Sequence, residues 1–216
     1  MEVKQFVNNP FQENTYVAWD EASHEAVIID CGALNEKEKI DIECFVENHQ
    51  LKVRHVVNTH LHLDHCFGVA WACQLYNVKL EASAEDSSLL HTMRQQAELF
   101  GIPGSYIDSS VDTMRIQALA EGDVISLGNT SIKVIATPGH TRGGLCFYSP
   151  EDAIIFTGDT LFNGSVGRTD LDGGSYSELI NSIRTKLVIL PDNVRVYCGH
   201  GPYTTISDEK KYNPYL

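Results

Sequence analysis

Thr59-His60-Leu61-His62-Leu63-Asp64-His65 is the stretch from which both the fold and the chemistry of this chain can be read. It directly follows Val53–Asn58, a short apolar run that predicts a buried strand. Its three imidazoles and one carboxylate are the nitrogen and oxygen ligands that zinc and related metal ions favour. A solvated loop or a group of core histidines is the alternative, but ionisable groups at this density need a compensating partner. The stretch therefore predicts a metal site at the end of a strand.

The spacing within this stretch indicates two metal ions. His60 and His62 alternate, as two ligands of one ion would. Asp64 and His65 come two and three positions later, as if they served a second ion. A loop at a strand end can direct alternate side chains into one space, which a continuous helix cannot do.

Three further residues of ligand type occupy the same kind of position elsewhere in the chain. They are His140, Asp159 and His200, and each lies beside glycine just after a run that predicts a strand, at 132–136, 153–156 and 194–197. Glycine permits the sharp backbone turn that such a position needs. We expect these three side chains to complete the metal site.

The order of the predicted elements is strands, helices, strands, helix and strand. Strands are expected at 3–7, 15–19, 26–29, 53–58, 78–81, 115–119, 124–126, 132–136, 144–148, 153–157 and 194–198, and helices at 35–50, 67–76, 83–100 and 175–190. The glycine-rich stretch 158–174 predicts a long functional loop, and 208–216 a polar tail. This order predicts an α+β fold in which two sheets face each other with helices outside. No linker or repeat divides residues 1–216, so we expect a single domain.

Composition excludes several classes of protein. Of the 216 residues, 43% are hydrophobic and 21% are charged, which is ordinary for a globular chain. No apolar run is long enough to predict a transmembrane helix. The N-terminal residues Met1–Phe6 have no basic stretch before an apolar run, so no signal peptide is predicted and a cytoplasmic protein is expected. The net charge of −13 disfavours nucleic acid and anionic membranes as partners. The six cysteines are scattered without a CxxC pair, which predicts free, buried thiols in a reducing compartment.

Four motifs in this order resemble those of the metallo-β-lactamase superfamily: THLHLDH at 59–65, PGHT at 138–141, TGDT at 157–160 and GHG at 199–201. The resemblance covers nearly the whole chain and implies an αββα sandwich of two mixed sheets with a dinuclear metal site at one edge. It implies that one ion is bound by His60, His62 and His140, the other by Asp64, His65 and His200, and both by Asp159. Two zinc ions are the expected cofactors, with iron or manganese as alternatives.

Two departures indicate the branch of this family that resembles glyoxalase II. Antibiotic-hydrolysing members commonly carry cysteine where this chain has Asp159, and flavodiiron members usually carry glutamate at the position of His62. The segment 158–168 is also similar to glyoxalase II. Only sixteen residues follow His200, so the C-terminal helical domain of two-domain glyoxalase II is expected to be missing, and the chain resembles the short single-domain relatives.

The resemblance implies hydrolysis of a thioester such as a hydroxyacylglutathione by a hydroxide that bridges the two metal ions. Asp64 is the expected catalytic residue, because its carboxylate can orient that hydroxide. Thiols have a pKa of about 8.5, so the thiolate leaves without a strong general acid. Arg168 is a candidate anchor for a substrate carboxylate, with a structural pair to Asp170 or Asp64 as the alternative. Tyr203 either contacts the substrate or packs on the core.

The threonines beside the motifs, Thr59, Thr141 and Thr160, are expected either to orient the imidazoles or to cap local turns. The expected partner is a small-molecule acyl thioester, and the sequence makes no prediction of oligomeric state.

Other reactions on the same fold remain open. A persulfide dioxygenase with one iron is the first alternative, because Gly167–Asp170 also occurs in those enzymes, although Gly201-Pro202 favours a hydrolase. A lactonase is the second alternative. The net charge of −13 argues against a ribonuclease, and the seven intact ligand positions argue against a non-catalytic scaffold.

Overall fold

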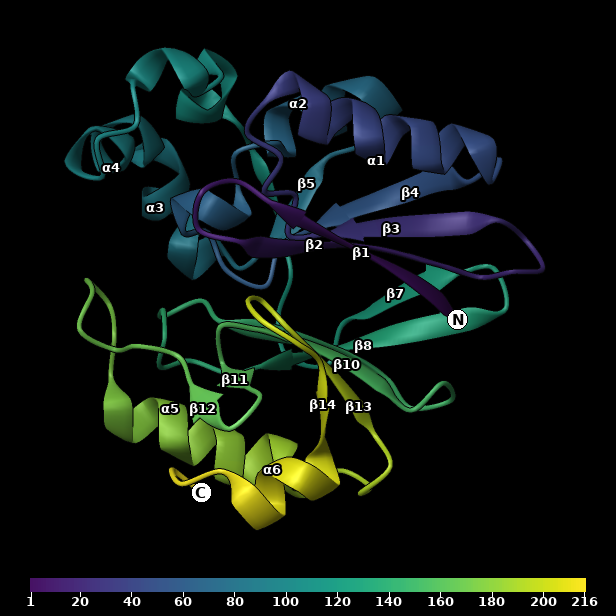
Figure 1. Ribbon diagram of the computed structural model, residues 1–216, viewed down its shortest axis with the longest axis vertical. Helices are drawn as coiled ribbons and strands as arrows, with labels where there is room; N and C mark the ends of the chain where they lie inside the picture. Colours follow the sequence, from purple (N-terminus) through teal and green to yellow (C-terminus); the bar gives the residue numbers. More distant parts are fainter.

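The computed structural model describes residues 1–216, which form four layers: helices, sheet, sheet and helices (Figure 1). The first sheet contains, in spatial order, β1 (Glu2–Asn8), β2 (Glu13–Trp19), β3 (Glu25–Ile29), β4 (Lys52–Val57), β5 (Leu80–Ala82) and β6 (Ile116–Ala118). The second contains β14 (Thr204–Thr205), β13 (Arg195–Cys198), β10 (Ile154–Gly158), β9 (Leu145–Ser149), β8 (Thr130–Ala136) and β7 (Val124–Leu127). A short hairpin pairs β11 (Leu161–Phe162) with β12 (Ser165–Val166).

Helices cover the outer face of each sheet. Figure 1 shows α1 (Glu36–Asn48), α2 (Val69–Tyr76), α3 (Ser87–His91) and α4 (Met93–Leu99) beside the first sheet, and α5 (Tyr176–Ser182) and α6 (Ile206–Tyr212) beside the second. None of these helices has the length and apolar character needed to cross a bilayer.

Both sheets are mixed. In the first sheet β1, β2 and β3 pair antiparallel, and β3 through β6 pair parallel. In the second sheet all neighbours are antiparallel except β10 and β13. The predicted α+β sandwich of two facing mixed sheets is therefore confirmed.

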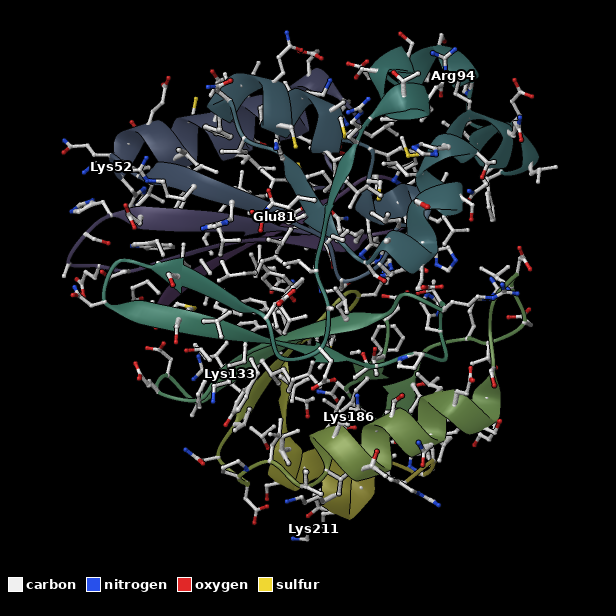
Figure 2. The ribbon with its side chains drawn as sticks, turned by 180° about the vertical axis from the view of Figure 1, so that it is seen from behind. Lys52, Glu81, Arg94, Lys133, Lys186 and Lys211 are labelled. Carbon is white, nitrogen blue, oxygen red and sulfur yellow. The ribbon has the colours of Figure 1, made fainter.

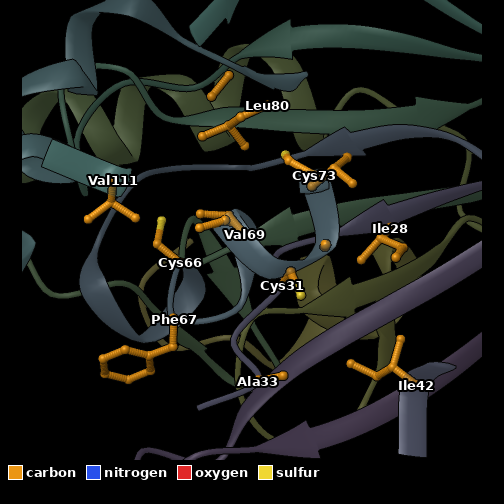
Figure 3. Close-up of a cluster of buried hydrophobic side chains, with 14 of the residues drawn as sticks. Ile28, Cys31, Ala33, Ile42, Cys66, Phe67, Val69, Cys73, Leu80 and Val111 are labelled. Atoms are coloured by element: carbon orange, nitrogen blue, oxygen red, sulfur yellow. The ribbon is translucent and has the colours of Figure 1, made fainter. Parts of the chain in front are cut away.

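Three apolar cores lie between the four layers, and strand periodicity assigns alternate residues to different cores. In β3, Val27 and Ile29 face the second sheet, whereas Ala26 and Ile28 face the helices. Between the sheets, the ring of Tyr16 packs against Phe156 at 5.3 Å. Figure 3 shows part of the core under the helices, where Ile28 lies near Ile42 of α1 and Val69 of α2. The third core lies under α5 and contains Leu179, Ile183 and Leu187.

The cysteines follow the expectation with one exception. All six are free, and five are buried, among them Cys31, Cys66 and Cys73 in the core of Figure 3. Cys44 is exposed on α1, so the expectation of burial is wrong at that position.

The predicted helix 83–100 is interrupted. A short 3₁₀ turn at Ala84–Asp86 leads into α3, and α4 begins anew after Thr92. The Thr92 hydroxyl donates to the carbonyl of Ser88 at 2.8 Å, which also accepts from the Thr92 N–H at 3.1 Å, and a threonine bonded in this way tends to bend a helix.

The predicted polar tail contains a helix, α6. Thr205 caps it by accepting from the backbone N–H of Asp208, and α6 buries Ile206 against the second sheet. The Thr-x-x-Asp pattern at 205–208 was the available signal for this helix.

Gly158, the last residue of β10, lies against Thr59, which follows β4 of the other sheet. Its φ is +49°, and an added Cβ would lie 2.1 Å from Thr59 Oγ1. Gly122 has a φ of +88° but has open space around it. Gly158→Ala adds a clash to the backbone strain, so we expect it to lower the free energy of unfolding by about 3 kcal/mol or more. Gly122→Ala should cost about 1 kcal/mol.

Urea unfolding of both variants in the presence of a chelator measures this difference without any contribution from bound metal. Equal losses in the two variants would show that Gly158 is not held tightly against Thr59.

Candidate metal centre

Residues of ligand type follow the ends of four strands at one edge of the sandwich. The stretch 59–65 follows β4, and His140, Asp159 and His200 follow β8, β10 and β13. The last three strands run in the same direction, because β10 pairs parallel with β13 and both β8 and β10 pair antiparallel with β9. Their carboxyl ends therefore meet at one edge, which is where open sheets of this kind place ligands.

Backbone hydrogen bonds fasten these loops to one another. The N–H of Gly199 donates to the carbonyl of Gly158 at 2.8 Å, and the N–H of Leu145 donates to the carbonyl of Thr59 at 2.7 Å. The second bond joins the two sheets directly. The positions of the ligand-type residues are thus set by the backbone and not only by side-chain packing.

His60, His62 and His140 form the first group. Their ring nitrogens lie within 4.8 Å of one another, and all three residues are buried. Nδ1 of His62 is 2.9 Å from Nε2 of His140, and Nε2 of His60 is buried without any hydrogen-bond partner. Three nitrogens thus converge on one small space.

Asp64, His65 and His200 form the second group, which is equally compact. Nε2 of His200 lies 3.3 Å from Asp64 Oδ2 and 3.3 Å from Nε2 of His65. The burial of His65 is complete, whereas Asp64 and His200 retain some exposure.

Asp159 lies between the two groups. Its Oδ2 is 3.6 Å from His140 Nε2 in the first group. Its Oδ1 is 3.3 Å from His65 Nε2 and 3.6 Å from His200 Nε2 in the second group. This Oδ1 atom is buried and accepts no hydrogen bond. A single carboxylate therefore presents one oxygen to each group.

The environment controls the charge of these groups. Burial, together with the neighbouring imidazoles, holds the pKa of His60 well below its usual value, and burial and His140 lower the pKa of His62 to about 4. Burial alone would raise the pKa of Asp159, but His65 and His200 outweigh it and the pKa is lowered. Neutral imidazoles and ionised carboxylates are the forms that bind metal ions.

Two carboxylates, those of Asp64 and Asp159, lie close to the histidines of the second group. Burial favours the neutral form of His65, but the carboxylates of Asp159 and Asp64 outweigh it and raise the pKa of His65 well above its usual value. The carboxylates thus attract positive charge to the space between Asp64, His65 and His200. Together with the orphaned Nε2 of His60 and Oδ1 of Asp159, this shows that the residues present fit divalent metal ions.

Asp30 orients two of the histidines, and sequence reasoning missed it. Its Oδ2 lies 3.2 Å from His65 Nδ1 and accepts from the Thr59 hydroxyl at 2.7 Å. The Thr59 oxygen in turn lies 3.1 Å from Nδ1 of His60. Such contacts fix the ring orientation of metal-binding histidines. Asp30 directly follows β3, as Asp159 follows β10, so a charged residue at the end of an apolar strand was the available signal.

Two more imidazoles are oriented by backbone carbonyls. Nδ1 of His140 lies 2.7 Å from the carbonyl oxygen of Arg168, and Nδ1 of His200 lies 3.1 Å from that of Phe11. These contacts leave Nε2 of both rings directed at the site. A carbonyl contact carries no side-chain signature, so the sequence could not reveal them.

The other two threonines do not contact an imidazole. The Thr141 hydroxyl donates to Asp86 Oδ2 at 2.8 Å, and the Thr160 hydroxyl lies 3.1 Å from that of Thr137. Asp86 is buried and also accepts from the N–H of Gly143 at 2.7 Å. It therefore holds the loop that carries His140, and sequence reasoning missed it as well.

The two candidate substrate residues lie in different places. Arg168 lines the cavity above the ligand-type residues, but its guanidinium donates two hydrogen bonds of 2.7 Å to Asp170, which is the structural alternative. Tyr203 lies in a separate hollow beside Asn163 and packs on the guanidinium of Arg195 at 5.3 Å. The structure does not bring Tyr203 to the metal centre.

A cavity of about 530 Å³ opens over the centre. Residues of both groups and Asp159 form its floor: His62, Asp64, His140, Asp159 and His200. A ligand in this cavity would therefore contact the space between the two groups.

Comparison with known proteins agrees with this geometry. Residues 8–200 match the sequence model of the metallo-beta-lactamase superfamily. The hydroxyacylglutathione hydrolase GloC of Haemophilus influenzae is 38% identical over 207 residues, which span 95% of this chain and 93% of the relative.

Two solved structures are similar over their full length, each with a TM-score of 0.85. The B3 metallo-beta-lactamase BLEG-1 is 30% identical and is matched over 100% of this chain and 99% of its own. TTHA1623, solved in a di-iron-bound form, is 32% identical and is matched over 99% of this chain and 100% of its own. With the match extending from β1 to His200, this chain belongs to the metallo-beta-lactamase superfamily of metallo-hydrolases.

Proposed function

We propose that this chain hydrolyses acyl thioesters, of which a hydroxyacylglutathione is one example, with two divalent metal ions. The observation that carries the proposal is the pair of ligand groups on the cavity floor with Asp159 between them. The similarity to a hydroxyacylglutathione hydrolase supports the thioester as the substrate.

We assign the ligands by their grouping. His60, His62 and His140 would hold the first ion, Asp64, His65 and His200 would hold the second, and Asp159 would offer one carboxylate oxygen to each. Zinc is the proposed metal, and iron or manganese suits the same nitrogen and oxygen ligands. A relative with a di-iron form supports iron as the alternative. We place the protein in the cytoplasm, because all six of its cysteines are free thiols.

When bound, two such ions supply Lewis acidity and bring the pKa of a shared water toward neutral. Asp64 is the catalytic residue in this proposal. Its carboxylate lines the cavity, and it accepts a hydrogen bond from the attacking water and orients that water toward the thioester carbonyl.

The leaving group explains why this site needs no general acid. Every histidine that lines the cavity is assigned to a metal ion, and Arg168 is paired with Asp170. A thiolate with a pKa of about 8.5 departs without protonation, whereas an alkoxide would not. Thioesters therefore suit the groups present in the cavity better than ordinary esters do.

Metal content tests the ligand assignment. Protein purified without a histidine tag should contain two metal ions per chain by inductively coupled plasma mass spectrometry. Asp159→Ala should lose both ions on dialysis more readily than Asp64→Ala, because it removes one ligand from each ion. Asp172→Ala removes a carboxylate that lines the same cavity outside the ligand set, and it should keep both ions. Wild-type protein that stays metal-free after supplementation with zinc, iron and manganese would contradict the proposal.

The effect on activity of removing a ligand from the second group separates a two-metal hydrolase from a one-iron dioxygenase. A dioxygenase of this family would use one ion at His60, His140 and Asp159 and leave His65 unused. We expect His65→Ala to lower thioesterase kcat by at least about 100-fold, because the second ion loses a buried ligand. An oxygen electrode should record no oxygen consumption with glutathione persulfide in either protein. Oxygen consumption that survives His65→Ala, with one iron per chain, would assign the chain to the dioxygenases.

A further inference from the structure

One wall of the cavity over the metal centre is apolar, and neither the metal ions nor the thioester group requires this. We propose that this wall binds an apolar chain of several carbons on the thioester, so that the preferred substrates are uncharged, apolar thioesters and not those of a multiply charged thiol. This inference rests on the proposed thioesterase function and specifies the substrate class of the same site.

Large apolar side chains from four parts of the fold form the apolar wall. They are Phe11 from the β1–β2 turn, Leu63 beside the ligands, Leu89 of α3, and Leu99 and Phe100 at the end of α4. Leu99 is 86% exposed and Phe100 is 50% exposed. Contiguous exposed apolar side chains at the mouth of a cavity indicate a ligand that covers them.

The apolar wall is fixed in place by aromatic contacts. The ring of Phe100 meets that of Phe11 edge to face at 5.6 Å, and Phe11 lies over Phe67 at 6.4 Å. Phe67 is buried in the core under the helices. The end of α4 is therefore anchored beside the metal centre. Binding of a chain there costs little conformational entropy, because this part of the protein is already ordered.

The polar side chains that line the cavity beside the apolar wall, Gln96 and Thr92, already donate hydrogen bonds within the protein. The amide nitrogen of Gln96 donates to the carbonyl of Leu89 at 2.8 Å and to Thr92 Oγ1 at 3.0 Å. The Thr92 hydroxyl donates to the carbonyl of Ser88 at 2.8 Å. These bonds leave this side of the cavity without a hydroxyl or amide donor for a polar substrate.

The cavity lining also contains no unpaired cationic side chain that could bind a charged thiol. Arg168 is the only lysine or arginine in its lining, and Asp170 already occupies its guanidinium with two hydrogen bonds of 2.7 Å. Arg94 of α4 pairs with Asp112 at 3.5 Å, and Figure 2 shows it at the outer end of the helical layer. Asp172 adds a further negative charge to the lining.

The negative charge of Asp172 and the pairing of Arg168 with Asp170 disfavour binding of thiols that carry carboxylates or phosphates. Glutathione carries two carboxylates at neutral pH, and apart from the proposed metal ions the lining offers them only Arg168, which is paired with Asp170. The net charge of −13 adds a repulsive field around the whole molecule. An uncharged thioester avoids both costs and gains from burial of its chain.

The test compares two series of thioesters that carry the same acyl groups of two to eight carbons. One series uses N-acetylcysteamine, a neutral thiol, and the other uses glutathione. Burial of one methylene is worth about fourfold in affinity, so kcat/KM should rise by about fourfold per methylene in the neutral series until the cavity is filled. The glutathione series should show no advantage at equal chain length.

Variants then locate the effect. The double variant Leu99→Ala, Phe100→Ala should reduce the gain per methylene to less than about twofold, because it removes the mouth of the apolar wall. Tyr106→Ala is the matched control, since Tyr106 is an exposed large side chain of the same helical region outside the cavity. It should leave the chain-length dependence unchanged.

A binding measurement makes the inference testable apart from turnover. Calorimetry with S-alkyl thioethers of N-acetylcysteamine, which cannot be hydrolysed, should show a Kd that falls by about fourfold per methylene. If thioesters are not hydrolysed but this slope is present, the proposed function fails and the apolar ligand class stands. Turnover without chain-length dependence, or a preference for glutathione thioesters that Arg168→Ala abolishes, would overturn the inference and leave the thioesterase intact. Separate lengthening of the acyl and thiol sides shows which of them contacts the apolar wall.

Discussion

The gathering of seven ionisable side chains at one point, four of them buried, is the constraint on which the rest of this structure depends. Isolated charges and unpaired polar atoms are costly inside a protein, and this site contains both. His60 Nε2 and Asp159 Oδ1 are buried without hydrogen bonds, and two carboxylates face the same small space. Metal ions bound here would remove each of these costs at once. The fold keeps together groups that without such a partner would favour separation into water.

The sandwich can hold these ionisable side chains at one edge because its apolar cores lie between the layers and stabilise the fold without them. The three apolar layers stabilise the sheets away from the edge, and the strands end where the ligand-type residues begin. Glycine at the strand ends allows close approach, as between Gly158 and Thr59. Asp30 and backbone carbonyls then fix the directions of the rings, and Asp86 holds the loop that carries His140. Rigid support of this kind is what a metal centre needs if its ligands are to keep their geometry during turnover.

Much of this arrangement could be predicted from the sequence, because period-2 apolar runs define strands and the ligand motifs sit at their ends. The residues that escaped prediction act through tertiary contacts. Asp30 and Asp86 have no motif of their own, and the hydrogen-bond partners of their carboxylates lie 25 or more positions away. The break at Thr92 lies inside a pattern that is helical throughout, and the Thr92 hydroxyl bond to Ser88 that accompanies it has no clear signal in the sequence. Tyr203 follows His200 closely in sequence. The chain turns at Gly201, which has a φ of +73°, and Tyr203 then lies in another hollow.

The cavity could not be predicted at all, because it is assembled from segments that the sequence does not connect. The β1–β2 turn, the end of α4 and the loop that carries Arg168 meet only in the folded chain. Their combination places an apolar wall above a polar floor, and this contrast is the basis for assigning a substrate class beyond the general chemistry of the site.

Anomalous X-ray diffraction from crystals of the metal-loaded protein tests the central claim most directly. Data on either side of the absorption edge of the bound metal locate each ion without reference to activity. We expect two peaks, one among His60, His62 and His140 and one among Asp64, His65 and His200, with the Asp159 carboxylate between them. A single peak at full loading, or two peaks of which only one contacts Asp159, would contradict it.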